Sequence, residues 1–426
     1  MHDPAATGGG RAVVEPLEPR QLLATNGLNA VYFNNRDFTG AARTRIDSTV
    51  AFDWPDHSSP ARGIRGTTFA ARWSGLVKPY TSETYTFTTR NSDGVRLWVN
   101  GKLVIDAWTT STRKTHAGTI ALKANRLYDL RLEYFVGRRT AAITLFWSAP
   151  SRGQTVIATS RLFAYDTRSA SIGDFGRDNA GERDVARLMR TWKPEFITTV
   201  GDNNYEHGAA STIDRNVGKY FHDYIGNYKG SYGEGAGENL FFPTLGNHDW
   251  DTGTAKPHTD YFSLPGNERY YDFVKGPVHF FALDSDPREP DGTSAGSKQG
   301  QWLKDRLADS TSPFNVVYFH HAPFSSGSEG SSEHMQWPFR DWGADVVLTG
   351  HSHSYERLWV DDIPYVVNGA GASNAGIDDV VEQSVVREGN NLGALLIQAN
   401  EHALTMQYQL RDGRVFDTIT IGPSPL

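Results

Sequence analysis

The sequence predicts a two-domain chain, with an N-terminal all-β sandwich followed by an α/β domain. Residues 26–165 alternate apolar and polar side chains with the two-residue period of β-strands. Residues 166–426 instead alternate short apolar strands with amphipathic helices. The 426 residues exceed one average domain, and 38% are hydrophobic and 21% charged, which is typical of chains that fold around packed cores.

Residues 1–25 are rich in Gly, Pro and Ala and are expected to form a flexible tail. Within it, residues 17–24 read Leu-Glu-Pro-Arg-Gln-Leu-Leu-Ala. This segment resembles a short N-terminal motif of many planctomycete-type extracellular proteins, which implies export and a secreted, extracellular or periplasmic location. An ordinary flexible tail is the alternative. No apolar run approaches the about 20 residues of a transmembrane helix, so no transmembrane segment is expected.

The strands of the first domain follow from the alternation, and their turns follow from short polar pairs. Asn100-Gly101 is a strong signal for a two-residue hairpin, and it joins strands expected at 95–99 and 102–105. No stretch of this half has a helical period. The pattern therefore predicts an all-β sandwich. Its other expected elements are a turn at 91–94 and strands at 85–89, 127–135 and 142–147.

Three segments of this half, 85–108, 130–135 and 147–150, resemble the β-sandwich module named after the anthrax toxin protective antigen. Members of that family often accompany carbohydrate-active enzymes and adhesins, so the resemblance implies that residues 26–165 bind glycans. The calcium-dependent adhesin members use two adjacent aspartates. Residues 26–165 contain no Asp-Asp pair, which argues against a calcium-dependent sugar site. A spacer or packing role is the alternative.

Residues 151–170 are expected to form a polar linker, after which helices and strands alternate. The helix predicted at 182–192 has apolar residues at helical spacing and is followed by Pro194. Strands alternating with helices predict a layered α/β domain. The other expected helices are 213–225 and 299–307, the expected strands are 196–200, 240–245, 278–283, 316–319, 346–348 and 365–367, and a β-meander with a turn at Asp412-Gly413 spans 394–421.

Five short polar clusters lie next to turns or strand ends of the second domain. They read Gly-Asp-Phe-Gly (173–176), Gly-Asp-Asn-Asn-Tyr (201–205), Gly-Asn-His-Asp (246–249), His-His (320–321) and Gly-His-Ser-His (350–353). In layered α/β folds, ligands bind beyond the carboxyl ends of the strands, and loops there bring distant residues together. The clusters therefore predict a site for two metal ions. Its candidate ligands are Asp174, Asp202, Tyr205, Asn247, His320, His351 and His353.

The ordered clusters resemble those of the metallophosphatase superfamily, and within it the purple acid phosphatases. The resemblance implies a four-layer αββα fold. Most superfamily members have a metal-ligating histidine two residues after the first aspartate, where this chain has Gly176. The purple enzymes have a tyrosine at the position of Tyr205 instead. A phenolate is a hard anionic donor that favours Fe(III).

By this resemblance, Asp174, Tyr205 and His353 would hold Fe(III), and Asp202 would bridge both ions. Asn247, His320 and His351 would hold a divalent Fe, Zn or Mn ion. The resemblance implies an acid phosphatase that hydrolyses phosphate monoesters. Its nucleophile would be a metal-bound hydroxide, because coordination lowers the pKa of water from about 15.7 toward 7.

Three further residues are predicted to take part in catalysis. His248 follows a predicted ligand and is the candidate general acid, since its reference pKa of about 6.5 suits protonation of a leaving alkoxide. A hydrogen bond to a ligand carboxylate is its alternative role. Asp249 is expected to orient the imidazole of His248. His321 follows the predicted ligand His320 and is expected either to contact the phosphate or to lie behind the metal ligands. His334 is the nearest later histidine, beyond a Gly/Ser-rich loop.

Charge and cysteine content exclude several classes of function. The net charge of −7 argues against binding to a nucleic-acid backbone. The absence of cysteine excludes disulfides, thiolate metal sites and cysteine nucleophiles. Two alternatives to a phosphomonoesterase stay open. One is a phosphodiesterase or nucleotidase on the same scaffold, and the other is a glycan-binding surface protein with secondary phosphatase activity.

Overall fold

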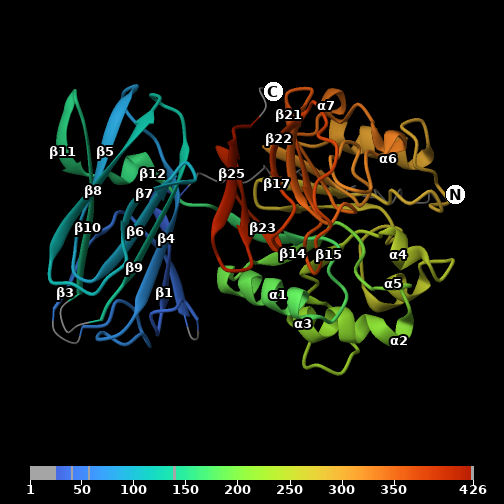
Figure 1. The fold of residues 1–426 in the computed structure, drawn as a ribbon, viewed down its shortest axis with the longest axis horizontal. Helices are drawn as coiled ribbons and strands as arrows, with labels where there is room; N and C mark the ends of the chain where they lie inside the picture. Colours follow the sequence, from blue (N-terminus) through green and yellow to red (C-terminus); the bar gives the residue numbers. More distant parts are fainter. Residues whose placement is uncertain (1–24, 40–41, 56–57, 138–140, 424–426) are drawn as a thin grey trace, which may run out of the picture.

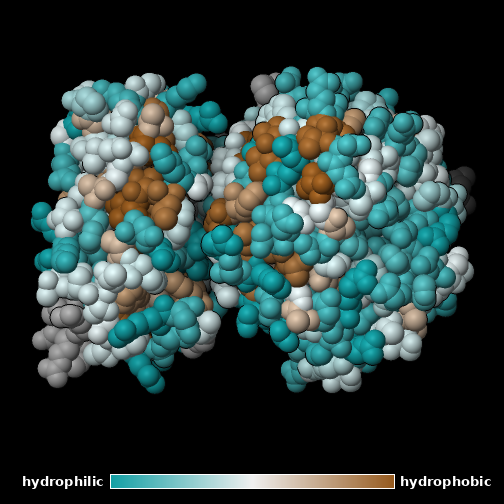
Figure 2. Space-filling view, viewed as in Figure 1, coloured by the Kyte–Doolittle hydropathy of each residue, from teal (hydrophilic) through white to brown (hydrophobic). Residues whose placement is uncertain are grey.

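The computed structural model describes residues 25–39, 42–55, 58–137 and 141–423. They form a β-rich N-terminal domain and a mixed C-terminal domain side by side (Figure 1). In the space-filling view the two domains meet along a narrow waist (Figure 2). The tail and its export-like motif at 17–24 lie outside the described residues.

The N-terminal domain is a sandwich of two antiparallel sheets, with strand orders β2-β1-β4-β9-β6-β7 and β11-β10-β5-β8. Every second side chain of the central strands points into one apolar core that includes Trp73, Phe87 and Trp147. Asn100 and Gly101 have φ values of 52° and 69° and form the predicted hairpin. The strands are β1 (Leu28–Phe33), β2 (Ala42–Asp47), β3 (Ala51–Trp54), β4 (Ala70–Val77), β5 (Glu83–Asn91), β6 (Gly94–Val99), β7 (Lys102–Ala107), β8 (Lys114–Leu122), β9 (Tyr128–Phe135), β10 (Ala141–Ala149) and β11 (Arg152–Val156).

The C-terminal domain stacks two sheets face to face, with orders β15-β14-β13-β23-β24-β25 and β16-β17-β18-β19-β21-β20-β22. Helix α1 packs on the outer face of the first sheet, and α6 and α7 pack on the outer face of the second (Figure 1). This arrangement is the αββα fold class that the sequence predicted. The helices are α1 (Ala180–Trp192), α2 (Ala210–Ile213), α3 (Lys219–Phe221), α4 (Asn247–Trp250), α5 (Lys256–Tyr261), α6 (Lys298–Ala308) and α7 (Phe339–Trp342).

The strands of this domain bring the five clusters to one edge. β13, β14 and β15 run parallel in the first sheet, and β17, β18, β19 and β21 run parallel in the second. Asp174, Asp202, Asn247, His320 and His351 each follow the carboxyl end of one of these strands. The strands are β13 (Thr167–Ile172), β14 (Phe196–Thr199), β15 (Phe241–Pro243), β16 (Tyr271–Lys275), β17 (Val278–Ala282), β18 (Phe314–Tyr318), β19 (Val346–Thr349), β20 (Tyr355–Val360), β21 (Ile363–Asn368), β22 (Ser384–Glu388), β23 (Gly393–Asn400), β24 (Ala403–Leu410) and β25 (Val415–Ile421).

The polar linker predicted at 151–170 is wrong, because these residues form strands. Besides β11, the segment holds β12 (Leu162–Phe163), which pairs with β4, and most of β13, a central strand of the C-terminal domain. Ser169 and Ser171 made β13 look polar, yet both are fully buried. The domain boundary proposed between 165 and 166 lies in the three-residue connection from β12 to β13.

The connection between the domains is hydrogen-bonded at every residue. The amide of Ala164 donates to the Thr25 carbonyl, and the amide of Asp166 donates to the Ala399 carbonyl. Between them, Tyr165 exchanges two hydrogen bonds with the side chain of Asn29. Both domains therefore hold this segment directly.

The helix predicted over 213–225 is a helical segment of changing pitch. It begins at α2, continues as a π-helical turn over Asp214–Gly218 and as α3, and ends in a 3-10 turn over His222–Tyr224. The π-helical turn begins at Asp214, whose side chain accepts hydrogen bonds from Tyr228 and Tyr261. Among the described residues, no helix is long and apolar enough to cross a membrane.

Candidate metal centre

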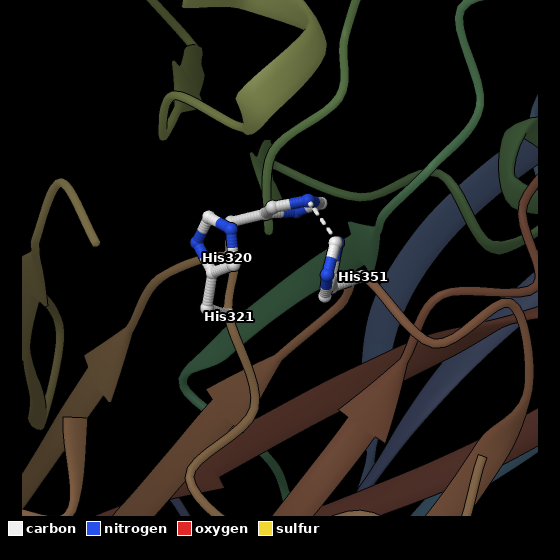
Figure 3. A group of neighbouring side chains, drawn as sticks. All are labelled: His320, His321 and His351. Carbon is white, nitrogen blue, oxygen red and sulfur yellow. Dashed lines mark hydrogen bonds between the residues drawn. The ribbon is translucent and has the colours of Figure 1, made fainter. Parts of the chain in front are cut away.

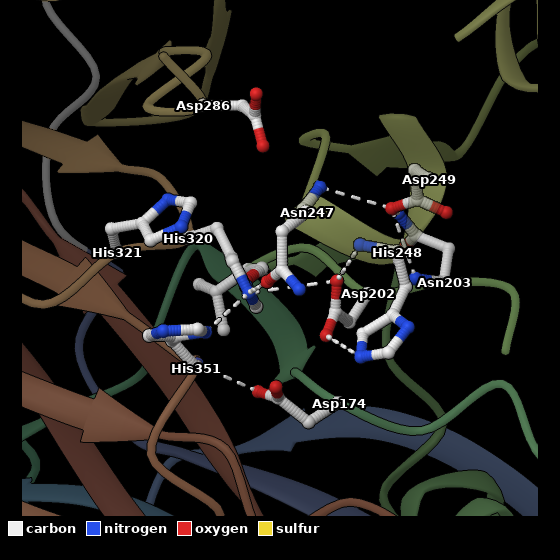
Figure 4. Close-up of polar contacts among 12 residues, drawn as sticks. Asp174, Asp202, Asn203, Asn247, His248, Asp249, Asp286, His320, His321 and His351 are labelled. Carbon is white, nitrogen blue, oxygen red and sulfur yellow. Dashed lines mark hydrogen bonds and ion pairs between the residues drawn. The ribbon is translucent and has the colours of Figure 1, made fainter. Parts of the chain in front are cut away.

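The seven predicted ligands form two groups of four donor atoms that share Asp202. Figure 4 shows five of them, namely Asp174, Asp202, Asn247, His320 and His351. In the first group, the Tyr205 hydroxyl lies 3.3 Å from Asp174 Oδ1, 2.8 Å from Asp202 Oδ2 and 3.1 Å from His353 Nε2. His353 Nε2 lies 3.4 Å from Asp174 Oδ1. These four atoms surround one point.

The second group centres on His320. Its Nε2 lies 2.9 Å from Asn247 Oδ1, 3.1 Å from His351 Nδ1 and 3.5 Å from Asp202 Oδ1. Asp202 therefore gives Oδ2 to the first group and Oδ1 to the second. A carboxylate divided in this way is placed to bridge two cations.

The donor separations fit coordination by metal ions. Neighbouring ligands that lie about 2.1 Å from one ion are about 3.0–3.4 Å apart. The donor pairs here are 2.8 to 3.5 Å apart. Asp174 and Asp202 are fully buried, and no Lys or Arg of the described chain forms an ion pair with either. Buried carboxylates without a cationic partner are costly unless a cation neutralises them.

The hydrogen bonding of His320 also suits a bound cation. Its Nδ1 must carry a proton, because it faces the carbonyl oxygen of Val200 at 2.9 Å. Burial lowers the pKa of His320 to about 4, so the ring is neutral and Nε2 keeps its lone pair. That lone pair faces the oxygens of Asn247 and Asp202, which are acceptors. A metal ion satisfies such a set of acceptors, and the Val200 carbonyl fixes the tautomer that binds it.

The backbone packs closely around the candidate ligands, which explains the glycine at position 176. Asp174, Asp202 and His351 adopt the left-handed conformation, with φ of 55°, 52° and 69°. At Gly176, a Cβ would overlap the carbonyl of Asn203. The position that carries a metal-ligating histidine in most of the superfamily therefore has no room for any side chain here.

The imidazole of His248 lies beside both Asp202 and Tyr205. Its Nδ1 contacts the carbonyl of Glu206, so this nitrogen carries a proton. Its Nε2 lies 3.9 Å from Asp202 Oδ2, and its ring centroid lies 4.4 Å from that of Tyr205. The backbone amide of His248 also donates to Asp202 Oδ1. The side chain is partly exposed, with its second nitrogen toward the metal ligands.

The orienting role expected for Asp249 is wrong, because its carboxylate does not contact His248. Successive residues of α4 point in different directions, and Asp249 Oδ2 accepts from the amides of Gly246 and Asn203 and from the Asn203 side chain. Burial, together with the charge of Asp202, raises the pKa of Asp249 to about 7. The imidazole is held instead by Glu206, with Asp251 at 3.7 Å.

His321 lies against the second donor group (Figure 3). Its ring centroid lies 4.5 Å from that of His351, and its Nδ1 lies 2.9 Å from Ser285 Oγ. Burial lowers its pKa far below the usual range, and the charges of His320 and His351 lower it further. The ring is therefore neutral. His334 lies next to it, with ring centroids 5.9 Å apart.

Several contacts at the site were not predicted from the sequence. The guanidinium carbon of Arg177 lies 3.7 Å from the centroid of the Tyr205 ring, and Arg177 also binds the carboxylate of Glu206. Ser373 holds Nδ1 of His353 at 3.1 Å. Arg177 directly follows the first cluster, and extending that cluster by one residue would have included it. Ser373 lies in a loop that has no comparable motif.

Comparison with protein families finds the same two domains that the structure shows. A model described as calcineurin-like phosphoesterase matches residues 168–355, and a PA14 domain model matches residues 24–160. The chain joins a PA14 domain to a calcineurin-like phosphoesterase domain. The phosphoesterase match contains all seven donor residues.

Curated relatives resemble the two domains separately. Tartrate-resistant acid phosphatase type 5 of Mus musculus is 24% identical over 243 residues, which are 48% of this chain and 72% of that protein. Purple acid phosphatase 15 of Arabidopsis thaliana is 25% identical over 280 residues, 57% of this chain and 49% of the plant protein. The anti-sigma-I factor RsgI3 of Acetivibrio thermocellus is 41% identical over 141 residues, but the match spans only 22% of that factor.

A solved structure shares the fold of the phosphoesterase domain. GAP50, the anchor in the inner membrane complex of Plasmodium, has a TM-score of 0.50 and 19% identity, over 61% of this chain and 89% of that one. The predicted resemblance to purple acid phosphatases is confirmed by the curated relatives. The phosphoesterase domain is accordingly assigned to metal-dependent phosphoester chemistry.

Proposed function

We propose that the chain is a secreted acid phosphatase of the purple type that hydrolyses phosphate monoesters at an Fe(III)–divalent metal centre. The division of the two oxygens of Asp202 between two donor groups supports this proposal most directly. The curated relatives that are acid phosphatases support the reaction. The motif at residues 17–24 supports export.

The two donor groups differ in chemical character. Asp174, Tyr205 and His353, with two anionic oxygens, suit Fe(III), whereas Asn247, His320 and His351, which are all neutral, suit a divalent Fe, Zn or Mn ion. When bound, the two cations supply Lewis acidity to the phosphoryl oxygens and lower the pKa of a water molecule. Asp202 keeps the two positions at a fixed separation.

His248 is proposed as the general acid. Its Nδ1 donates to the Glu206 carbonyl, so the second proton of the imidazolium form lies on Nε2, the nitrogen nearer Asp202. From there the proton can pass to the leaving alkoxide. The fixed Nδ1 bond prevents the ring from turning its acidic nitrogen away from the substrate.

His321 is proposed to bind the phosphate as a neutral donor. Ser285 Oγ accepts a hydrogen bond from the backbone amide of His321 and lies 2.9 Å from Nδ1 of the His321 ring. With the hydroxyl proton donated to Nδ1, the ring keeps its own proton on Nε2. A neutral N–H can then bind a phosphoryl oxygen without adding charge beside the metal ligands.

A visible spectrum combined with metal analysis tests the ferric assignment. Purified protein is expected to contain iron and to show the tyrosinate-to-iron band, and Tyr205→Phe is expected to lose that band. Tyr228→Phe, a tyrosine far from the clusters in sequence, is the control and should keep it. A colourless wild-type protein that contains only zinc would refute the ferric assignment while leaving two-metal hydrolysis possible.

Asp202→Asn tests the two-metal mechanism itself. The amide cannot offer two anionic oxygens, so hydrolysis of p-nitrophenyl phosphate should fall by about 10³-fold or more. Asp260→Asn, an exposed carboxylate on α5, should keep full activity. Intact hydrolysis in Asp202→Asn would sink the mechanism. Parallel assays with bis(p-nitrophenyl) phosphate and nucleotides separate the monoesterase from a phosphodiesterase or nucleotidase.

The PA14 domain supports a second, compatible role in glycan binding. Residues 26–165 lack the adjacent aspartates of the calcium-dependent adhesins. The β5–β6 turn contains a single aspartate, Asp93, whose carboxylate accepts hydrogen bonds from the amides of Ser111 and Gly137. A sugar site in this domain would therefore be independent of calcium. Binding of the full chain to a glycan array in the presence of a calcium chelator tests this role, and binding only with calcium would contradict it.

A further inference from the structure

A groove with a cavity volume of 570 Å³ lies where the two domains meet. One wall is the face of β4, β9 and β6, together with the loop after β1. The other wall is helix α1 and the turn between β24 and β25 of the phosphoesterase domain. This volume is within the about 300–1,000 Å³ of typical ligand sites.

The groove is lined by more arginines than carboxylates. Of its three acids, Glu133 is bound by Arg72 and Arg131, Asp412 is bound by Arg414 outside the groove, and Asp37 accepts from Thr39. The arginines that line it are Arg36, Arg72, Arg96, Arg131, Arg187 and Arg411.

The strand register concentrates this charge. Arg72 and Arg96 lie directly opposite Glu133, on the two strands that flank β9. Arg131, two residues from Glu133 on the same face, binds the same carboxylate oxygen as Arg72. Burial lowers the pKa of Arg72 to about 10, and the neighbouring charges of Arg131 and Arg168 add to this effect despite Glu133. Arg96 is also paired with Asp106, at 2.9 Å, so three arginines face two carboxylates and the face keeps a net positive charge.

Two stacked aromatic rings lie among these arginines. The rings of Phe38 and Trp108 are 5.9 Å apart and nearly parallel, at 24°. Arg72 lies over Phe38 at 4.6 Å, and Arg96 lies over Trp108 at 4.9 Å. Both rings are only partly buried. Arg72 and Arg96 cover part of the ring faces, so a sugar ring can contact the exposed ring atoms with its C–H groups while its acidic substituents reach the guanidinium groups.

We propose that this junction groove binds an anionic polysaccharide, with a sugar ring on the Phe38–Trp108 surface and its carboxylate or sulfate groups on the arginines. The volume of the groove is enough for a few sugar units. The net charge of −7 disfavours general binding of nucleic acid. The proposal extends the glycan-binding role of the PA14 domain and does not depend on phosphatase activity.

The phosphoesterase domain completes the site. Arg187 on α1 and Arg411 beside the β24–β25 turn face the sandwich across the groove. Arg187 is largely exposed, and its only ion pair among the described residues is with Asp184, at 3.4 Å. Arg411 forms no ion pair with any residue that the structure describes. Both side chains can therefore turn to an anionic ligand at little cost.

Affinity of the full-length protein for polygalacturonate tests the proposal. Isothermal titration should show binding that weakens with added NaCl, whereas the fully methyl-esterified polymer, which has the same backbone without charge, should not bind. Arg187→Glu and Arg411→Glu should each weaken binding about tenfold or more. Arg183→Glu is the matched control, because Arg183 lies on the same helix, contacts the same Asp184 and does not line the groove. It should bind as the wild type does.

Three outcomes would overturn the proposal. They are no binding of polygalacturonate or heparin, equal binding of the methyl-esterified polymer, and wild-type binding by Arg187→Glu and Arg411→Glu. Tighter binding of single-stranded poly(U) that competes for the same arginines would assign the groove to nucleic acid instead. Hydrolysis of p-nitrophenyl phosphate, measured on the same variants, should not change. Loss of polysaccharide binding is thus separable from failure of the proposed phosphatase.

Discussion

Gly176 is glycine because the backbone of the second cluster occupies the space beside its Cα. Gly176→Ala should therefore destabilise the protein by about 3 kcal/mol and reduce phosphatase activity, since the clash moves Asn203 and with it Asp202. Gly237→Ala is the control, because a Cβ there meets no other atom within 4 Å. Thermal unfolding of the two variants measures the difference in stability. An equally small loss of stability in both would show that the backbone at Asn203 shifts to make room for the added methyl group.

His248 provides a prediction about leaving groups. In His248→Ala, kcat for an alkyl phosphate should fall by about 10²-fold or more, because an alkoxide needs a proton to depart. The loss for p-nitrophenyl phosphate should be much smaller, since nitrophenolate leaves without one. His207→Ala, which removes an exposed histidine beside the site, should keep both rates. An equal loss for both esters would assign His248 to binding rather than to proton transfer.

The candidate ligands could be predicted because each follows a strand end in a short cluster. The surrounding contacts could not be predicted in the same way. His248 is held by a backbone carbonyl, that of Glu206, which no residue type signals. Asp249 was assigned to the wrong partner because neighbouring residues of a short helix point in different directions. The types of side chain thus located the site, whereas the direction of the backbone determined the hydrogen-bond partners of His248 and Asp249.

At the scale of the element, the start of helix α1 is tied to the metal centre. Asn179 caps the helix by accepting the amide of Glu182, and its amide group binds the carbonyl of Ala372. The next residue, Ser373, holds His353. Asn179→Ala should cost about 1–2 kcal/mol and should also lower activity.

The cap of α6 is a suitable comparison for this prediction. Ser297 accepts the amide of Gly300, and α6 packs on the outer face of the other sheet. Ser297→Ala should cost about 1 kcal/mol and leave kcat and KM unchanged. Chemical denaturation together with initial rates measures both effects. Unchanged activity in Asn179→Ala would mean that the path through Ala372 and Ser373 has no influence.

The strands with regular alternation were predicted well, and the polar central strand was not. β5, β6, β9 and β10 alternate clearly because one face of each packs in the sandwich core. β13 has the sequence Thr-Arg-Ser-Ala-Ser-Ile and looked like a linker. It is buried on both sides between β14 and β23, where small residues allow close packing. Periodicity finds half-buried strands but has little to detect in a fully buried one.

At the scale of the whole molecule, the domain junction should respond to acid. Burial alone would raise the pKa of Glu133, but the charges of Arg131 and Arg72 lower it to about 2. Since the folded pKa is below the unfolded value of about 4.3, this carboxylate stabilises the fold at higher pH. It should contribute about 2–3 kcal/mol above pH 5, and this contribution should disappear as the pH falls from about 4.5 to 2.

Glu133→Gln tests this pH dependence. The variant should be less stable than the wild type at pH 7, and the difference should shrink as the pH falls toward 3, because the Glu133 carboxylate of the unfolded wild-type chain becomes protonated before that of the folded chain. Glu238→Gln, which removes one exposed charge elsewhere, should follow the wild type at every pH. Urea midpoints across this range measure the effect. A difference in stability that stays constant with pH would show that Glu133 contributes through packing and not through its charge.

The connection at residues 164–166 is short, and each of its residues is hydrogen-bonded to one of the two domains. A flexible tether would let the enzyme sample every ester within a sphere around its attachment point, and selection would depend on local concentration alone. A short hydrogen-bonded connection instead limits the distance and the direction between the proposed metal centre and a ligand bound to the sandwich. Such a protein would hydrolyse esters that lie at one distance from the bound part of a polymer, and it would not reach identical esters at other distances.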